Sequence, residues 1–249
     1  MDAGTAGSII STWFFKVADG FSRGTPLELT WPVLLLVVAA AALLTIPRPV
    51  WRWFGLFVTF VHELGHAFAA LMTGQMIKGI QLRFDHSGQM RSMGSSRFAA
   101  AWTGFWGYPV PAAAGALLVW AAFNGWAGFA LSTGALILLA ALLFIRNAQG
   151  LIIALGCTGV SVLLVWFASP VAVSCTTLGT GIALLAGAVR DWFNVLSVHT
   201  RRRRSLQSSD AFILYQRTGV PSAIWLAAYA AVITLSWVAA LWWFRPAAG

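Results

Sequence analysis

Three side chains able to bind and use a metal ion lie within five residues of one another, in the sequence HELGH at 62–66. On a helix, residues four apart lie on the same face, so the imidazoles of His62 and His66 can converge on one ion. A catalytic zinc site takes three protein ligands and leaves its fourth position for water. Glu63 would lie close to that water, where it could accept a proton and return it to a leaving amine. The spacing therefore predicts a hydrolytic zinc site.

The apolar setting of this motif argues against a purely structural role. Phenylalanine, valine and alanine flank it on both sides, as expected for a helix inside a membrane. A charged side chain at the centre of such a helix costs about 2.5–3.5 kcal/mol, and buried histidines need hydrogen-bond partners. A structural His-Glu-His cluster is the alternative reading, and the cost of burying it favours a metal site.

Two histidines leave such a site one ligand short, and few carboxylates are available to complete it. Beyond residue 31 the sequence contains, besides Glu63, only Asp85, Asp191 and Asp210. Asp85 lies in the sequence Asp-His-Ser-Gly, where aspartate is favoured for bonds to the local backbone of a turn. Asp191 ends a long apolar stretch beside an arginine that could pair with it, and Asp210 begins the next helical stretch, where an acid is favourable in any case. Composition alone does not choose between Asp191 and Asp210 as the third ligand.

The composition places these residues in a membrane protein. Of the 249 residues, 59% are apolar and 9% are charged, whereas about 25% of the residues of a soluble domain are charged. Aromatic residues make up 14%, which excludes an intrinsically disordered chain. The net charge of +9 is typical of basic residues that orient membrane helices. We therefore expect the lipid bilayer, and not nucleic acid, to be a partner.

The elements that position the motif are predicted to be membrane helices. Apolar runs near the ~20 residues needed to cross a bilayer occur at 31–47, 53–73, 98–121, 126–145, 150–168, 171–189 and 221–244. The sequence thus predicts an all-α polytopic membrane protein with about six to seven transmembrane helices in one membrane domain, 31–249. Residues 1–30 are predicted to form an interfacial segment, because aromatic residues there adjoin a lysine.

Two segments are too polar to cross the membrane. Residues 75–96 alternate apolar and polar side chains before a turn sequence, which predicts a β-hairpin directly after the motif helix. Polar backbone at membrane depth is tolerated only beside protein or a water-filled cavity, so a hairpin folded back along that helix implies a wet cavity. Residues 190–209 contain four consecutive arginines at 201–204 and are predicted to form a cytoplasmic loop.

Three groups of residues, spread over about 50–225, resemble one known family. They are the HELGH sequence with Thr73-Gly74 and the hairpin after it, the Gly107-Tyr108-Pro109-Val110-Pro111 sequence, and a series near the C-terminus that comprises Asp191-x-x-Asn194, the arginines, Ser209-Asp210-Ala211 and Thr218-Gly219-Val220-Pro221. Together they resemble the intramembrane zinc metalloproteases of the site-2 protease class, in its M50B-like branch from bacteria and plants. The resemblance implies a bacterial plasma membrane location and membrane-embedded protein or peptide substrates.

The resemblance also implies roles for individual residues. His62 and His66 match the zinc-binding histidines of the family, and Glu63 matches its general base. A Ser-Asp-Ala motif recurs in the M50B-like branch, which favours Asp210 as the third zinc ligand. The wider class carries its aspartate in an Asn-Pro…Asp-Gly signature that this sequence lacks, and Asp191 therefore stays the alternative third ligand.

The hairpin is expected to bind the substrate. An extended substrate segment that pairs with its edge would expose the scissile amide, and Ile77, Ile80 and Leu82 are the predicted substrate-binding residues. The principal alternative function is a zinc-binding or partner-binding membrane protein of the same fold that cuts nothing. A small transporter fits less well, since no internal repeat relates the two halves of the sequence. Oligomeric state stays open.

Overall fold

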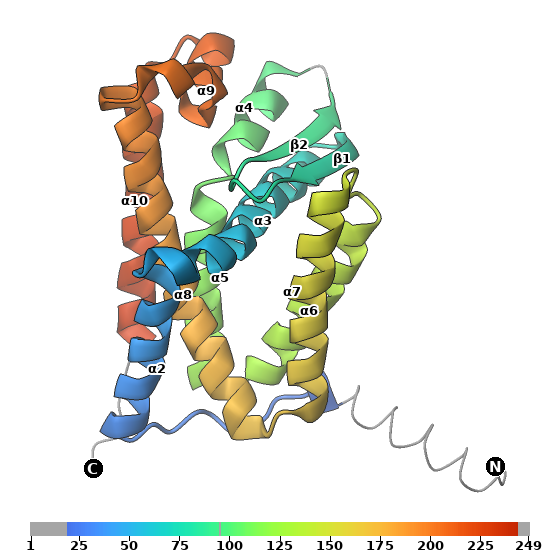
Figure 1. Cartoon of the computed structure of the whole chain (residues 1–249), viewed down its shortest axis with the longest axis vertical. Coiled ribbons are helices and arrows are strands. Elements are labelled where there is room, and N and C mark those ends of the chain that lie inside the picture. Colours follow the sequence, from blue (N-terminus) through green and yellow to red (C-terminus); the bar gives the residue numbers. More distant parts are fainter. Residues whose placement is uncertain (1–18, 95, 244–249) are drawn as a thin grey trace, which may run out of the picture.

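The computed structural model describes residues 19–94 and 96–243 as a bundle of helices that carries a two-stranded sheet (Figure 1). The helices are α2 (Trp31–Thr45), α3 (Arg48–Met72), α4 (Arg97–Phe105), α5 (Pro109–Phe123), α6 (Ala127–Leu142), α7 (Ala148–Phe167), α8 (Pro170–Thr200), α9 (Asp210–Thr218) and α10 (Ser222–Trp243). A short 3-10 helix, η1 (Arg203–Ser208), precedes α9, and the strands are β1 (Met76–Leu82) and β2 (Gly88–Met93). The predicted helical architecture with a small hairpin after the motif helix is confirmed.

The predicted number of membrane spans is not confirmed. Among the described residues, α3, α7, α8 and α10 are long and apolar enough to cross a membrane, and α4 with α5 makes at most a fifth span that is bent by 55°. Helices α2 and α6 have 15 and 16 residues, fewer than the ~20 that a crossing needs. The apolar runs are longer than these helices because α2 ends before Pro47 and because the chain after α6 turns to pair with β1.

Two further predicted boundaries were wrong. The run 98–121 was predicted to be one continuous helix, but it breaks at 106–108, because Pro109 has no N–H to donate to the carbonyl four residues earlier. The loop predicted at 190–209 is helical as far as Thr200, since α8 continues. Trp192 and Val195 in that stretch pack with Leu214 of α9, so their apolar side chains extend the core rather than a loop. Of the predicted interfacial segment, residues 1–18 lie outside the described residues, as does residue 244 of the last predicted span.

Helix α5 lies at the centre of the bundle, where it packs against α8 and α10, while α2 packs on α8 and α6 on α7. Helix α3 runs obliquely to α7 and α10 in Figure 1. Arg190 of α8 ties the start of α3 to the end of α2, because its guanidinium donates hydrogen bonds to the carbonyls of Thr45 and Ile46 and lies 4.5 Å from the ring centre of Trp51. The oblique motif helix is therefore fixed at its N-terminal end.

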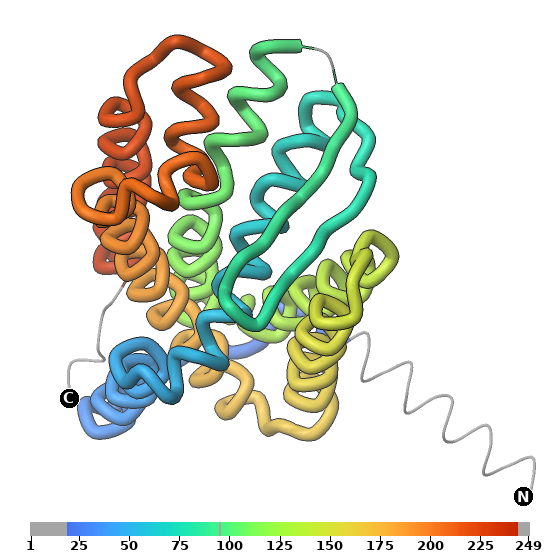
Figure 2. The backbone as a smooth tube through the Cα atoms, turned by 45° about the horizontal axis from the view of Figure 1, so that its top comes forward, coloured from blue at the N-terminus to red at the C-terminus, as the bar shows by residue number. Residues whose placement is uncertain are grey.

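The hairpin lies along α3, with β2 on the side of α4 and β1 on the side of α7 (Figure 2). The strands are antiparallel, Ile80 pairs with Met90, and the register shifts between Ile77 and Gly79. At the turn, His86 adopts a positive φ of 65° and stacks on Trp51 of α3 with ring centres 6.1 Å apart. The hairpin tip is thus anchored to the first turns of the motif helix.

Candidate metal centre

The side chains of His62, His66 and Asp210 converge on one point between α3 and α9. The two Nε2 atoms of the histidines are 3.1 Å apart, and Oδ2 of Asp210 lies 3.2 Å from Nε2 of His62 and 3.4 Å from Nε2 of His66. Zinc bonds of about 2.0–2.1 Å in a tetrahedral site separate neighbouring ligand atoms by about 3.3 Å. The three atoms therefore have the spacing that a tetrahedral zinc ion requires, and potential ligand atoms of His62, Glu63 and His66 also lie within 4.8 Å of one another.

Asp210 reaches the histidines because it is the first residue of α9, at the end of the helix that favours an anion. The preceding residue, Ser209, is buried and its hydroxyl lies 2.8 Å from Nε2 of His199 on α8. Burial alone would raise the pKa of Asp210, but while His66 is protonated its charge and the hydrogen bonds from both motif histidines hold that pKa well below its usual value. Asp210 is accordingly a carboxylate, the form that binds metal.

The orientation of His66 is set by a hydrogen bond from α4. Its Nδ1–H donates to the main-chain carbonyl of Thr103 at 2.7 Å, so the lone pair of Nε2 is free to bind a metal. Thr103 lies in the last turn of α4, which ends at Phe105, and carbonyls in the last turn of a helix have no partner within it. The break between α4 and α5 thus provides the acceptor that fixes this ligand.

The same break leaves room beside the ligand nitrogens. A Cβ at Gly107 would lie 2.5 Å from Cε1 of His66 and 2.6 Å from Nε2 of His62, and closer still to Nε2 of His66. The next residue, Tyr108, places its ring edge-to-face with the imidazole of His62, with centres 4.7 Å apart. Any side chain at position 107 would collide with the two imidazoles, so a glycine lets the chain pass next to the converging atoms, which are spaced to fit a small ion.

Glu63 lies between the histidines and strand β2. The residue is 4% exposed, and its Oε2 atom has no hydrogen-bond partner among the described residues. A Cβ at Gly88 of β2 would overlap Oε1, and the main chain of Met90 also interacts with this carboxylate. A buried carboxylate oxygen without a partner is costly, which is consistent with a site that is completed by water or substrate.

The other two candidate ligands, Asp85 and Asp191, have different surroundings from Asp210. Asp85 accepts hydrogen bonds from the backbone and the hydroxyl of Ser87, at 3.0 and 2.6 Å, in the turn that its sequence predicts. These bonds lower the pKa of Asp85. Asp191 interacts electrostatically with His62, but in the part of the chain that the structure describes the carboxylate–histidine pairs within 4.0 Å involve Asp210 alone. Arg190 binds α2 instead of pairing with Asp191.

The predicted substrate-binding residues require a correction. Ile80 and Leu82 are each 1% exposed and belong to the core between α3, α6 and α7, so their side chains cannot contact a substrate. Ile77 is also partly buried against that core. The pattern of alternating side chains correctly indicated a strand, but the apolar face of β1 is used for packing within the protein.

The sequence did not predict how three residues position the site, although Gly107 belongs to one of the motifs that resemble the family. Thr103 orients His66, Gly107 makes room for the ligand atoms, and Asn147 binds the backbone of β1 at Leu82. A glycine two residues before a proline in an apolar run was the one available signal, since it indicates a helix break. The roles of Thr103 and Asn147 depend on contacts between distant segments and have no local pattern.

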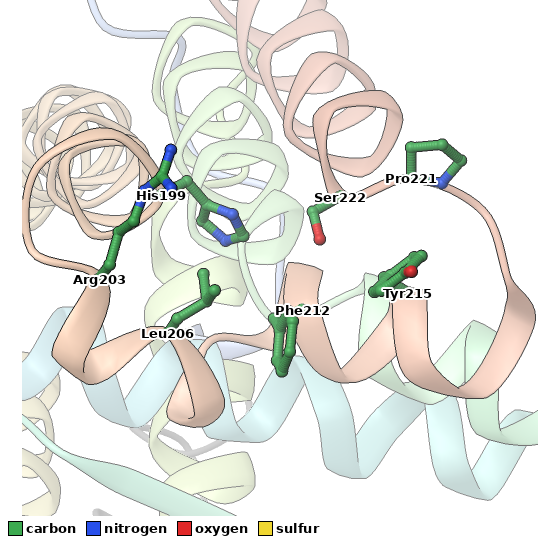
Figure 3. A pocket seen from close by; sticks show the side chains of 7 residues that line it. All are labelled: His199, Arg203, Leu206, Phe212, Tyr215, Pro221 and Ser222. Carbon is green, nitrogen blue, oxygen red and sulfur yellow. The ribbon is translucent and has the colours of Figure 1, made fainter.

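A cavity of about 340 Å³ lies beside α9, separate from the ligand atoms (Figure 3). It is lined by His199, Arg203, Leu206, Phe212, Tyr215, Pro221 and Ser222. Through the contact of His199 with Ser209, its wall touches the residue that precedes Asp210.

Comparison with protein families shows which family the chain resembles over most of its length. The model of the family described as Peptidase M50B-like matches residues 35–242, most of the chain. Comparisons with curated proteins and with solved structures found no match.

Proposed function

Because the chain belongs to the M50B-like peptidase family, we propose that it is an intramembrane zinc metalloprotease that hydrolyses peptide bonds of membrane-embedded substrates. The observation that carries this proposal is the convergence of His62, His66 and Asp210 at 3.1–3.4 Å beside the buried Glu63. Family membership and the apolar helices together indicate a multi-pass membrane protein, which supports a substrate that is itself in the membrane.

In this proposal His62, His66 and Asp210 hold the zinc ion. When bound, zinc supplies a Lewis acid that polarises a carbonyl and lowers the pKa of water. Glu63 accepts the proton of the attacking water and returns it to the nitrogen of the leaving amine. The hydrogen bond from His66 to Thr103 keeps the ligand in the required tautomer, and Gly107 keeps the space beside the ligands free.

The substrate binds as an extended strand along β2. Ile80 directs its N–H and C=O away from β2, toward 144–146, so the opposite residue Met90 directs its own groups away from β1. Leu82 likewise directs its N–H and C=O away from β2, toward Asn147, so the opposite residue Gly88 directs its own groups away from β1. A peptide that pairs with these groups passes next to Glu63, and its extended conformation exposes the amide that is to be cut.

The decisive experiment pairs zinc content with cleavage of single-span peptides that are reconstituted with the protein in liposomes. Glu63→Gln should lower cleavage by about 100-fold or more, the range of a general base, and should keep about one zinc per chain. Asp210→Ala should lose the zinc. Asp191→Ala is the matched control and should retain it.

Each outcome separates the proposal from its rival. Zinc-free native protein, or native cleavage by Glu63→Gln, would contradict a zinc protease. Zinc retained in Asp210→Ala and lost in Asp191→Ala would make Asp191 the third ligand. Stoichiometric zinc without cleavage of any peptide would favour the zinc-binding membrane protein that cuts nothing.

A further inference from the structure

A buried amide side chain, that of Gln75, joins three elements around the metal centre. Gln75 follows the end of α3, is 8% exposed and has partners on both sides of its amide. Its Nε2 lies within hydrogen-bond distance of three oxygens, Oγ1 of Thr73 at 2.9 Å, the carbonyl of Ala99 at 3.1 Å and Oγ1 of Thr103 at 2.6 Å. Its Oε1 accepts a hydrogen bond from the hydroxyl of Ser92 at 2.8 Å.

One arm of this amide leads to a metal ligand. Gln75 donates its shortest bond to the side chain of Thr103, and the main-chain carbonyl of the same threonine accepts the proton of His66 Nδ1 at 2.7 Å. The second bond of Gln75 to α4, at Ala99, lies one turn away from Thr103. The amide therefore fixes the end of α4 at the place where this helix holds His66.

The other arm leads to the strand that borders the site. Ser92 lies on β2, two residues beyond Met90 and four beyond Gly88, and both of those residues adjoin Glu63. Gly94, directly after β2, packs so closely that a Cβ there would lie 2.6 Å from Cγ of Gln75. The amide therefore fixes the C-terminal end of β2, whereas the stack of His86 on Trp51 fixes its other end.

We infer that Gln75 is a positioning residue that holds the zinc ligand His66 and the substrate-binding strand β2 in one hydrogen-bond network. Only a side chain with both donors and an acceptor can serve Thr103, Ala99 and Ser92 together, and an amide has both. Groups that hydrogen-bond to metal-binding histidines typically change metal affinity or activity by about 10–100-fold when removed. The inference rests on the proposed zinc site, and its readouts do not depend on cleavage.

The test uses three variants that interrupt the network at different points. Zinc affinity is measured by chelator competition, and the opening of β2 is measured by amide hydrogen exchange. Thr103→Val cuts the metal arm and should weaken zinc binding about 10-fold, with β2 exchange unchanged. Ser92→Ala cuts the strand arm and should speed exchange in β2, with zinc affinity within threefold of native. Gln75→Met keeps the length of the side chain, removes the amide, and should show both effects.

Two controls keep the result specific. Thr103→Ser retains the hydroxyl and should restore native zinc affinity, and the thermal unfolding of each metal-free variant reports whether it is folded. Zinc affinity of Gln75→Met within threefold of native would overturn the inference. A 10-fold loss of zinc affinity in Ser92→Ala would overturn it as well. If Gln75→Met does not fold, equal affinities of Thr103→Val and Thr103→Ser overturn it. Absence of zinc from the native protein would instead contradict the proposed function.

Discussion

The two strands of the hairpin differ in what their outer edges contact. On β1, Ile80 donates to the carbonyl of Phe144 at 2.8 Å and accepts from the N–H of Arg146 at 2.9 Å. Asn147 then binds both main-chain groups of Leu82, at 3.1 and 2.6 Å, as a neighbouring strand would. On β2, no backbone hydrogen bond to a further element is present within 19–94 and 96–243.

This difference shows which edge is available for function. Open strand edges are rare within membranes and are tolerated only beside protein or a water-filled cavity, because unpaired backbone groups cost several kcal/mol in lipid. At this edge the main chain of Met90 interacts with the carboxylate of Glu63, and a Cβ at Gly88 would also meet that carboxylate. The closed edge therefore holds the hairpin in place, and the open edge fits the proposed role of pairing with a substrate strand.

The largest effect is expected where β2 meets the catalytic carboxylate. In Gly88→Val the new Cβ would overlap Oε1 of Glu63, so the base must move and cleavage should fall about 100-fold or more. Zinc content should stay native, because the atoms nearest to a Cβ at position 88 belong to Glu63 and not to a metal ligand. Gln89→Val is the matched control, since Gln89 is exposed on the same strand. Native cleavage by Gly88→Val would separate β2 from the reaction.

A pair of proline substitutions tests the two edges directly. Met90→Pro removes an N–H that points to the open edge and that interacts with the Glu63 carboxylate. Because both the edge and the base are affected, kcat/KM should fall by at least about 10-fold, equivalent to ~1.4 kcal/mol, with stability retained. Ile80→Pro removes the N–H that bonds Phe144 and disturbs a buried residue, so the loss should appear in thermal unfolding. Equal losses of stability in both variants would show that the edges do not differ.

The motif helix and the hairpin were predictable because both depend on local periodicity. The repeat of histidines at i and i+4 predicted a shared face, and the alternation before the turn predicted paired strands. The choice between the edges of the hairpin was not predictable, because the partner of Ile80 at 144–146 is more than sixty residues away. The same reason explains why apolar periodicity pointed to Ile80 and Leu82 as substrate contacts, when it marked the face of β1 that packs in the core.

The ligand set was predictable in part for a related reason. Scarcity of carboxylates reduced the candidates for the third ligand to Asp191 and Asp210, but apolar patterning placed the end of α8 eleven residues too early, so Asp191 was predicted at the end of the helix and not within it. The orientation of His66 by Thr103 requires a helix end that only the packed structure provides.

A substitution at Asn147 tests the closed edge of β1. Asn147→Leu leaves the N–H and C=O of Leu82 without their side-chain partner, and unsatisfied buried groups cost about 1–3 kcal/mol. The midpoint of thermal unfolding should fall, with cleavage per folded molecule near native because β2 is unchanged. Gln149→Leu is the control, since its bond to the exposed Phe84 N–H is longer, at 3.3 Å. A selective loss of cleavage in Asn147→Leu would show that β1, too, takes part in the reaction.

The smallest effect concerns the tip that joins both strands. Burial is the largest effect on His86 and lowers its pKa. The Gly55 carbonyl and Asp85 oppose it in part, whereas the smaller effect of Arg190 lowers the pKa further and that of the Arg52 carbonyl raises it least. The folded tip therefore favours neutral histidine. Its stabilisation is complete above about pH 6.5, the ordinary histidine pKa, and declines as the pH falls from there toward the lowered pKa, because the unfolded chain binds the proton first.

Amide exchange in β2, corrected for the intrinsic effect of pH, should accordingly quicken between pH 7.5 and 5.5 in the native protein. His86→Phe retains a ring that can stack on Trp51 and has no proton to bind, so the same change of pH should alter its exchange less. Because β1 is held at 144–147 independently of the tip, exchange at Ile80 and Leu82 should respond least. Equal acceleration of both strands would mean that the tip anchors the whole hairpin and that the closed edge adds little.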